Sequence, residues 1–64
     1  MRDSKRALAE VAALLGVDTP TARTYLRAVQ RLAGPVPYEQ IAAVLRSVED
    51  RSAESVARAM AGGT

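Results

Sequence analysis

The stretch that decides the fold is residues 19–33, which read Thr-Pro-Thr-Ala-Arg-Thr-Tyr-Leu-Arg-Ala-Val-Gln-Arg-Leu-Ala. At about 100° per residue, a helix here would gather its apolar side chains on one side: Ala22, Tyr25, Leu26, Val29, Leu32 and Ala33. The other side would carry an arginine face of three residues spaced four apart, Arg23, Arg27 and Arg31. Because no carboxylate occurs between Asp18 and Glu39, no partner within the segment neutralises these arginines. The segment therefore predicts an amphipathic helix with one purely basic face.

The residues just before this segment predict a tight turn after a first helix over residues 4–15. Gly16 stands where that helix needs a left-handed residue to end. Thr19 followed by Pro20 is a start signal, because threonine caps a helix well and proline in the first turn gives up an N–H that has no partner there. We expect Val17, the one apolar residue of the link, to fill the angle between the two helices.

The helix over residues 4–15 has its own start signal and its own apolar face. Either Asp3 or Ser4 can cap it. Its apolar face would consist of Leu8, Val11, Ala12 and Leu15. This face is the natural partner for the apolar side of residues 20–33.

The second half of the chain predicts two further helices. Gly34-Pro35 ends the helix over residues 20–33, and the next apolar face recurs at helical spacing over residues 38–48: Tyr38, Ile41, Leu45 and Val48. Asp50 or Ser52 can then cap a fourth helix over residues 52–61. The alternative is one bent helix over residues 38–61. We expect an all-α fold of a single domain over residues 1–64, in which four short helices form two helical hairpins.

A weak internal repeat supports the two hairpins. Residues 10–15, Glu-Val-Ala-Ala-Leu-Leu, are echoed by residues 40–45, Gln-Ile-Ala-Ala-Val-Leu. Residues 21–29 are echoed by residues 52–60 in the same way. An equally good explanation is that alanine-rich amphipathic helices resemble each other. Only the first copy carries the arginine face.

Composition narrows the class of protein. The 64 residues include no cysteine and no histidine, which removes disulfides, thiolate chemistry and the usual zinc ligands. We expect no metal, no cofactor, no small-molecule substrate and no enzymatic activity. So small a core favours help from a second copy, hence a homodimer. No stretch is long enough for a membrane span, and the expected location is the cytoplasm.

Charge is concentrated in the first half of the chain. Residues 1–33 carry six basic and three acidic side chains, whereas residues 34–64 carry three basic and four acidic ones. Eight of the nine basic residues are arginine, which suits bidentate contacts to phosphates and bases but is equally typical of a GC-rich genome. A negatively charged partner would therefore contact the first half of the chain.

The first predicted hairpin resembles the helix-turn-helix superfamily of DNA-binding proteins over about residues 7–29. That motif favours a small residue, a glycine four residues later, and apolar residues six and nine beyond the glycine. The matching positions are Ala12, Gly16, Ala22 and Tyr25. Ala22 is smaller than the branched residue usual at its position. The second hairpin is similar, more weakly, to sigma-factor-like regulators, but Arg46 replaces the glycine and a longer turn follows, so we expect a structural or dimer-forming role for it.

The resemblance implies a DNA-binding site. Residues 19–33 would be the recognition helix in the major groove, with its first turn nearest the bases and its exposed N–H groups able to meet a phosphate. The implied contacts are Thr19, Thr21, Arg23, Thr24, Arg27 and Arg31, together with Lys5 and Arg6 as further phosphate contacts. The predicted function is a small sequence-specific duplex-DNA-binding protein, a transcriptional regulator or a plasmid or phage accessory protein. The alternative is a helical protein-interaction or oligomerisation module that binds no nucleic acid.

Overall fold

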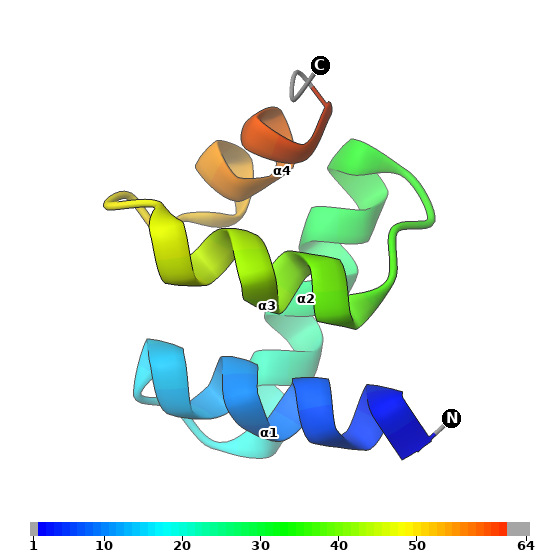
Figure 1. The fold of residues 1–64 in the computed structure, drawn as a ribbon, viewed down its shortest axis with the longest axis vertical. Coiled ribbons are helices and arrows are strands. Elements are labelled where there is room, and N and C mark those ends of the chain that lie inside the picture. The colour runs from blue at the N-terminus through cyan, green and yellow to red at the C-terminus, as the bar shows by residue number, and fades with distance from the viewer. Residues whose placement is uncertain (1, 62–64) are drawn as a thin grey trace.

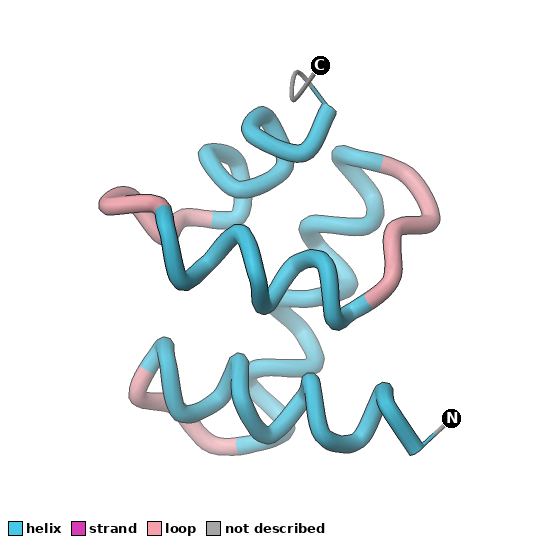
Figure 2. The backbone as a smooth tube through the Cα atoms, in the orientation of Figure 1, coloured by secondary structure: helices cyan, strands magenta, loops and turns pink. Residues whose placement is uncertain are grey.

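The computed structural model describes residues 2–61, and these residues form an all-α fold without strands (Figures 1 and 2). The four helices are α1 (Arg2–Leu15), α2 (Thr19–Ala33), α3 (Tyr38–Ser47) and α4 (Ala53–Ala61). Each end lies within two residues of the sequence-based expectation. The predicted fold class and the predicted break between the last two helices are confirmed, so the alternative of one bent helix over residues 38–61 is wrong.

The helices form two consecutive hairpins that interlock. α1 and α3 lie side by side and cross α2, which runs behind them in Figure 1. The most extensive packing is between hairpins, with α2 against α4 and α1 against α3, while α1 also packs on α2. α4 covers the C-terminal half of α2 and does not reach α1. Neither hairpin therefore has a complete core of its own.

One core cluster draws residues from all four helices. The largest side chains that are fully enclosed are Val11, Leu26, Val29, Ile41, Leu45 and Val56. No polar or charged side chain is buried among the described residues. The core is held by apolar packing alone, at roughly 25 cal/mol for each Å² of apolar surface removed from water.

The turn between α1 and α2 is closed by backbone hydrogen bonds. Gly16 has a φ of +70°, as its predicted role required. The Val17 N–H donates to the Ala12 carbonyl at 3.0 Å and the Gly16 N–H to the Ala13 carbonyl at 3.3 Å, the pair of bonds that defines a Schellman motif. Since the backbone alone closes the turn, the Val17 side chain is not needed as a filler. It is 37% exposed, and the expectation that it fills the angle between the helices is wrong.

One predicted helix start also needs correction. Asp18, not Thr19, is the N-cap of α2, because its carboxylate accepts the Thr21 N–H at 3.2 Å and Thr19 is already helical. A carboxylate is the stronger acceptor and also faces the positive end of the helix dipole. The other predicted capping residues, Asp3 and Ser4 of α1, have side chains that lie outside the described part of the structure.

The start of α4 uses both predicted capping residues. The Ser52 hydroxyl accepts the Ser55 N–H at 3.2 Å, as an N-cap does. Asp50 accepts the Ser52 N–H at 3.1 Å and the Ser55 hydroxyl at 2.8 Å. This local network explains why a new helix starts at Ala53.

Arg51, in the turn between α3 and α4, joins three helices. Its Nε donates to the Leu45 carbonyl at 3.2 Å and its Nη1 to the Leu14 carbonyl at 3.0 Å, so one guanidinium meets the last turns of both α3 and α1. Its own carbonyl accepts the Tyr25 hydroxyl of α2 at 2.9 Å. The positive charge of Arg51 also interacts favourably with the negative dipole ends at the C-termini of both helices.

We expect Arg51→Met to lower the free energy of unfolding by about 1–2 kcal/mol, because two carbonyls lose a charged donor while the apolar stem is kept. In a domain of this size each kcal/mol corresponds to a fall in Tm of about 4–8 °C. Thermal unfolding followed by circular dichroism measures this. Arg27→Met is the matched control, since Arg27 is exposed and makes no hydrogen bond to any described residue. An equal loss in both variants would contradict the role of Arg51.

The two described glycines with positive φ should differ in their tolerance of asparagine. Gly16 (φ +70°) lies in the left-handed region that asparagine also visits, whereas Gly34 combines φ +97° with ψ −174°, a conformation nearly restricted to glycine. A Cβ at either position meets no atom within 4 Å, so only the backbone decides. We expect Gly16→Asn to cost about 0.5–1 kcal/mol and Gly34→Asn about 1–3 kcal/mol in denaturant titrations. Equal costs would contradict this.

Candidate nucleic-acid interface

The arginine face lies on the outside of α2. Arg23, Arg27 and Arg31 are exposed, and none of them has an ion-pair or hydrogen-bond partner among the described residues. The other side of the helix is fixed, because Ala22, Leu26 and Val29 have no exposed surface. Since α3 and α4 pack on that apolar side, they leave the arginines uncovered.

The first turn of α2 offers fewer free N–H groups than the sequence suggested. Thr19, Thr21 and Thr24 are exposed, but the Thr21 N–H is bonded to the Asp18 carboxylate. Pro20 has no N–H, which leaves Thr19 as the one unoccupied donor among the first three residues. With a carboxylate at the helix start as well, this end of α2 is poorly suited to hold a phosphate. The positive charge for a phosphate lies further along, on the arginine face.

Two side chains of α2 are already engaged within the protein. The Thr24 hydroxyl donates to the Pro20 carbonyl at 3.2 Å, so towards a ligand it can act only as an acceptor. The Tyr25 ring is partly buried against the core and its hydroxyl donates to the Arg51 carbonyl. Burial raises the pKa of Tyr25 above its ordinary value, with a further increase from the Asp50 charge. Tyr25 is thus a packing residue, as its spacing predicted, and not a platform on which a base could stack.

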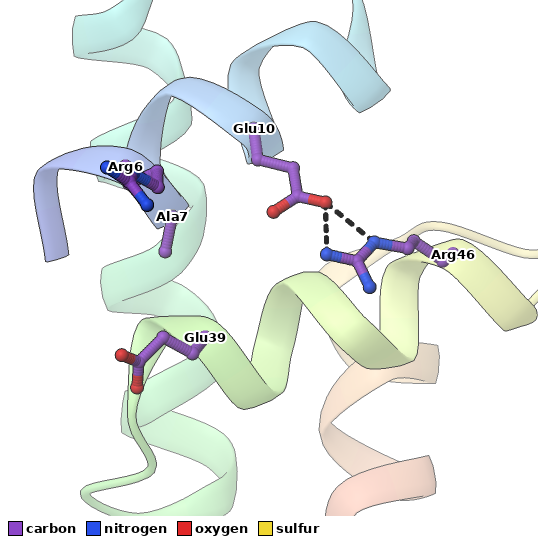
Figure 3. Close-up of a pocket in the computed structure, with 5 residues that line it drawn as sticks. All are labelled: Arg6, Ala7, Glu10, Glu39 and Arg46. Atoms are coloured by element: carbon purple, nitrogen blue, oxygen red, sulfur yellow. Dashed lines mark hydrogen bonds and ion pairs between the residues drawn. The ribbon is translucent and has the colours of Figure 1, made fainter. Parts of the chain in front are cut away.

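The two basic candidates on α1 have different surroundings. Lys5 and Arg6 are both exposed, but Arg6 lines a hollow of about 190 Å³ between α1 and α3 (Figure 3). Glu10, Glu39 and Arg46 share this hollow, and Arg46 donates its Nε to Glu10 at 2.6 Å and forms an ion pair with it. Two carboxylates beside Arg6 make this hollow mixed in charge. The structure does not group Arg6 with the arginine face.

Arg51 is the residue that the sequence-based reasoning missed. The sequence gives it one signal only, a basic residue in a break between apolar helices, because the carbonyls that it meets belong to Leu14, 37 positions away, and Leu45. Its guanidinium is occupied by the fold and is not available to a ligand in the way that the arginine face is.

The described residues contain no group of three or more histidine, cysteine, aspartate or glutamate side chains placed to hold a metal ion. None of the described helices has the length and apolar character that a membrane crossing needs. Comparisons of the chain with protein-family models, with curated proteins and with solved structures found no match.

The caps of α2 and α4 predict a loss of stability in acid. Hydrogen bonds from the hydroxyl and then the N–H of Thr21 lower the pKa of Asp18 below its ordinary value of 3.8, and bonds from Ser55 and Ser52 lower the pKa of Asp50. Both carboxyls have a lower pKa in the folded protein than in the unfolded chain. Their contribution to the free energy of unfolding is therefore complete above the pKa of the unfolded chain, and it is lost as the pH falls through the pKa of the folded protein. We expect Tm to fall between about pH 5 and pH 2.

The variant Asp18→Asn, Asp50→Asn separates these caps from the other carboxylates. Asparagine still caps a helix but does not titrate, so Tm of the variant should depend less on pH over this range. A matched control is Glu39→Gln, which removes an exposed carboxylate without a hydrogen bond in the described part of the chain. If the double variant kept the full pH dependence of the parent, the caps would not be its source.

Proposed function

We propose that this protein binds duplex DNA in a sequence-specific manner, with α2 lying in the major groove. The observation that carries the proposal is the arginine face: three guanidinium groups without a partner among the described residues, on one side of a helix whose other side packs against the core. An α-helix is about 10–12 Å across, and the major groove of B-DNA is about 12 Å wide. A helix enters it only if its exposed side is free, which is the case for Arg23, Arg27 and Arg31.

The groups on α2 suit different parts of the DNA. Arg23, Thr21 and Thr24 lie in the first two turns, where a recognition helix meets base edges, and a guanidinium can bind guanine through two hydrogen bonds. Arg27 and Arg31 follow one and two turns later, where the helix would leave the groove and pass the phosphates. Thr19 and Lys5 serve as flanking contacts, and Arg6 is the weakest candidate because of the carboxylates around it.

We further propose a homodimer as the binding species. A monomer with about five phosphate contacts would bind weakly at physiological salt, because each contact loses affinity as salt replaces the released counterions. Two copies on half-sites about 34–36 Å apart combine their contacts. Such a protein would act in the cytoplasm as a transcriptional regulator or as a plasmid or phage accessory protein.

A second candidate function has an observation in its favour. Leu32 is 58% exposed near the end of α2, which leaves a large apolar side chain available for a protein contact. On this alternative the protein is a helical interaction or oligomerisation module, and the arginine face meets an acidic protein surface. A measurement of DNA binding distinguishes the two functions, because the interaction module would bind no duplex.

Replacing Arg27 by Gln should weaken binding to every duplex by a similar factor and reduce the slope of log K against log salt by about 1, since one phosphate contact is lost. Replacing Arg23 by Gln should cost about 1–3 kcal/mol on the preferred sequence and less on random DNA, since a base contact is lost. Fluorescence anisotropy at several salt concentrations measures both effects.

Arg46→Gln is the matched control, because it removes the same charge from the hollow between α1 and α3. Its slope should stay close to that of the parent protein. Absence of binding to any duplex at about 50 mM salt, or an affinity independent of salt, would reject the proposed function. Circular dichroism checks that all three variants remain helical.

A further inference from the structure

Leu32 borders a hollow of about 420 Å³ between the end of α2 and α4. We call it the Leu32 hollow; its other walls are Glu54, Ala57, Arg58 and Ala61. The spacing of apolar residues places Leu32 on the core side of α2, yet more than half of its surface is exposed. The short side chains of Ala57 and Ala61 do not extend far enough from α4 to cover it. The surface of the monomer thus combines a protruding leucine with a depression beside it.

The charges around the hollow have a simple arrangement. Glu54 and Arg58 are both exposed and lie one turn apart on α4. The sequence spacing favours an ion pair between them, but the ion pair present among the described residues is that of Arg46 with Glu10. Neither Glu54 nor Arg58 has a hydrogen bond or an ion pair among the described residues, although the charge of Arg58 also acts on Asp50 and helps to lower the pKa of that carboxyl. One negative and one positive group therefore flank the apolar centre.

This pattern is complementary to itself under a two-fold rotation. In such an interface, if one residue contacts a second on the partner, the second contacts the first in return. Two α4 helices that pack antiparallel would bring each Glu54 opposite Arg58 of the partner subunit. The same rotation would place each Leu32 over the partner's depression, where the alanines allow a close approach.

We propose that the Leu32 hollow is the homodimer interface, occupied by the same surface of a second copy with the two α4 helices antiparallel. The inference rests on the dimer put forward under the proposed function and specifies its surface. A second groove lies between α3 and α4, lined by Gln40, Ala43, Val44, Ala59 and Met60. That groove carries no charge to fix the orientation of a partner.

The position of the Leu32 hollow is compatible with two DNA half-sites. Leu32 lies about 100–180° around α2 from the three arginines, so a partner there leaves the arginine face open. Thr19 and Leu32 are separated by about 20 Å along the helix at 1.5 Å per residue. With the two-fold axis near Leu32, twice this length is about 40 Å, which is comparable to the 34–36 Å between adjacent half-sites.

The test is sedimentation equilibrium of the protein and its charge variants without DNA. Glu54→Arg alone and Arg58→Glu alone should each be monomeric, because each puts like charges opposite each other in its own dimer. An equimolar mixture of the two variants should form a heterodimer, since both contacts across the interface are then between opposite charges. Leu32→Gln, a change at an exposed position, should weaken the dimer at least tenfold. Arg27→Glu is the matched charge reversal on α2 and should leave the dimer unchanged.

Three results would overturn the proposed interface: a parent protein that stays monomeric to about 1 mM, a dimer that tolerates all three interface variants, and single charge variants that do not associate when mixed. A dimer that tolerates these variants but is lost on Ala43→Glu uses the groove between α3 and α4 instead. Because no DNA is present, these outcomes are independent of the proposed function. A dimer that behaves as expected but binds no duplex would reject DNA binding and leave the interface in place.

Discussion

Burial of one face of α2 is the constraint on which the rest of the structure depends. Ala22, Leu26 and Val29 have no exposed surface, so the helix cannot rotate about its axis without bringing an apolar side chain into water. Each such side chain is worth about 1.5–3 kcal/mol when large, and less for alanine. The orientation of the arginine face follows directly, because residues on the far side of a packed helix have to point outward. The candidate site is thus fixed in position by a core that it does not belong to.

Polar contacts then fix the relative positions of the helix ends, which apolar packing alone leaves undetermined. Apolar surfaces can slide over one another, whereas the hydrogen bonds of Arg51 require the ends of α1 and α3 to meet the turn before α4. The side chain of Gln30 has a similar effect at the other turn, where it donates to the Val36 carbonyl at 2.9 Å. These contacts are few, yet in a domain of this size 1–2 kcal/mol is a large part of the net stability. Function at the arginine face would depend on them indirectly, through the rigidity of α2.

Much of the fold could be predicted because its signals are local. Glycine at the end of α1, proline in the first turn of α2 and apolar residues at helical spacing each act within one or two turns of helix. The internal repeat agrees with the structure at its best-matched positions, where Val11 and Ile41 are both fully buried. The errors were local as well: Asp18 took the capping role expected of Thr19, and Val17 stayed exposed because the backbone closed the turn without it.

The sequence by itself determined the helices, their apolar faces and the placement of three arginines opposite the core, because helical periodicity requires no knowledge of the rest of the chain. The tertiary structure alone decided which helices cover which. It paired α1 with α3 and α2 with α4, placed Arg6 among carboxylates, and brought Arg51 to the end of a helix 37 positions away. It also left Leu32 exposed although its spacing is that of a core residue. Each of these features depends on contacts between segments that are distant in the chain, and such contacts leave no periodic signal in the sequence.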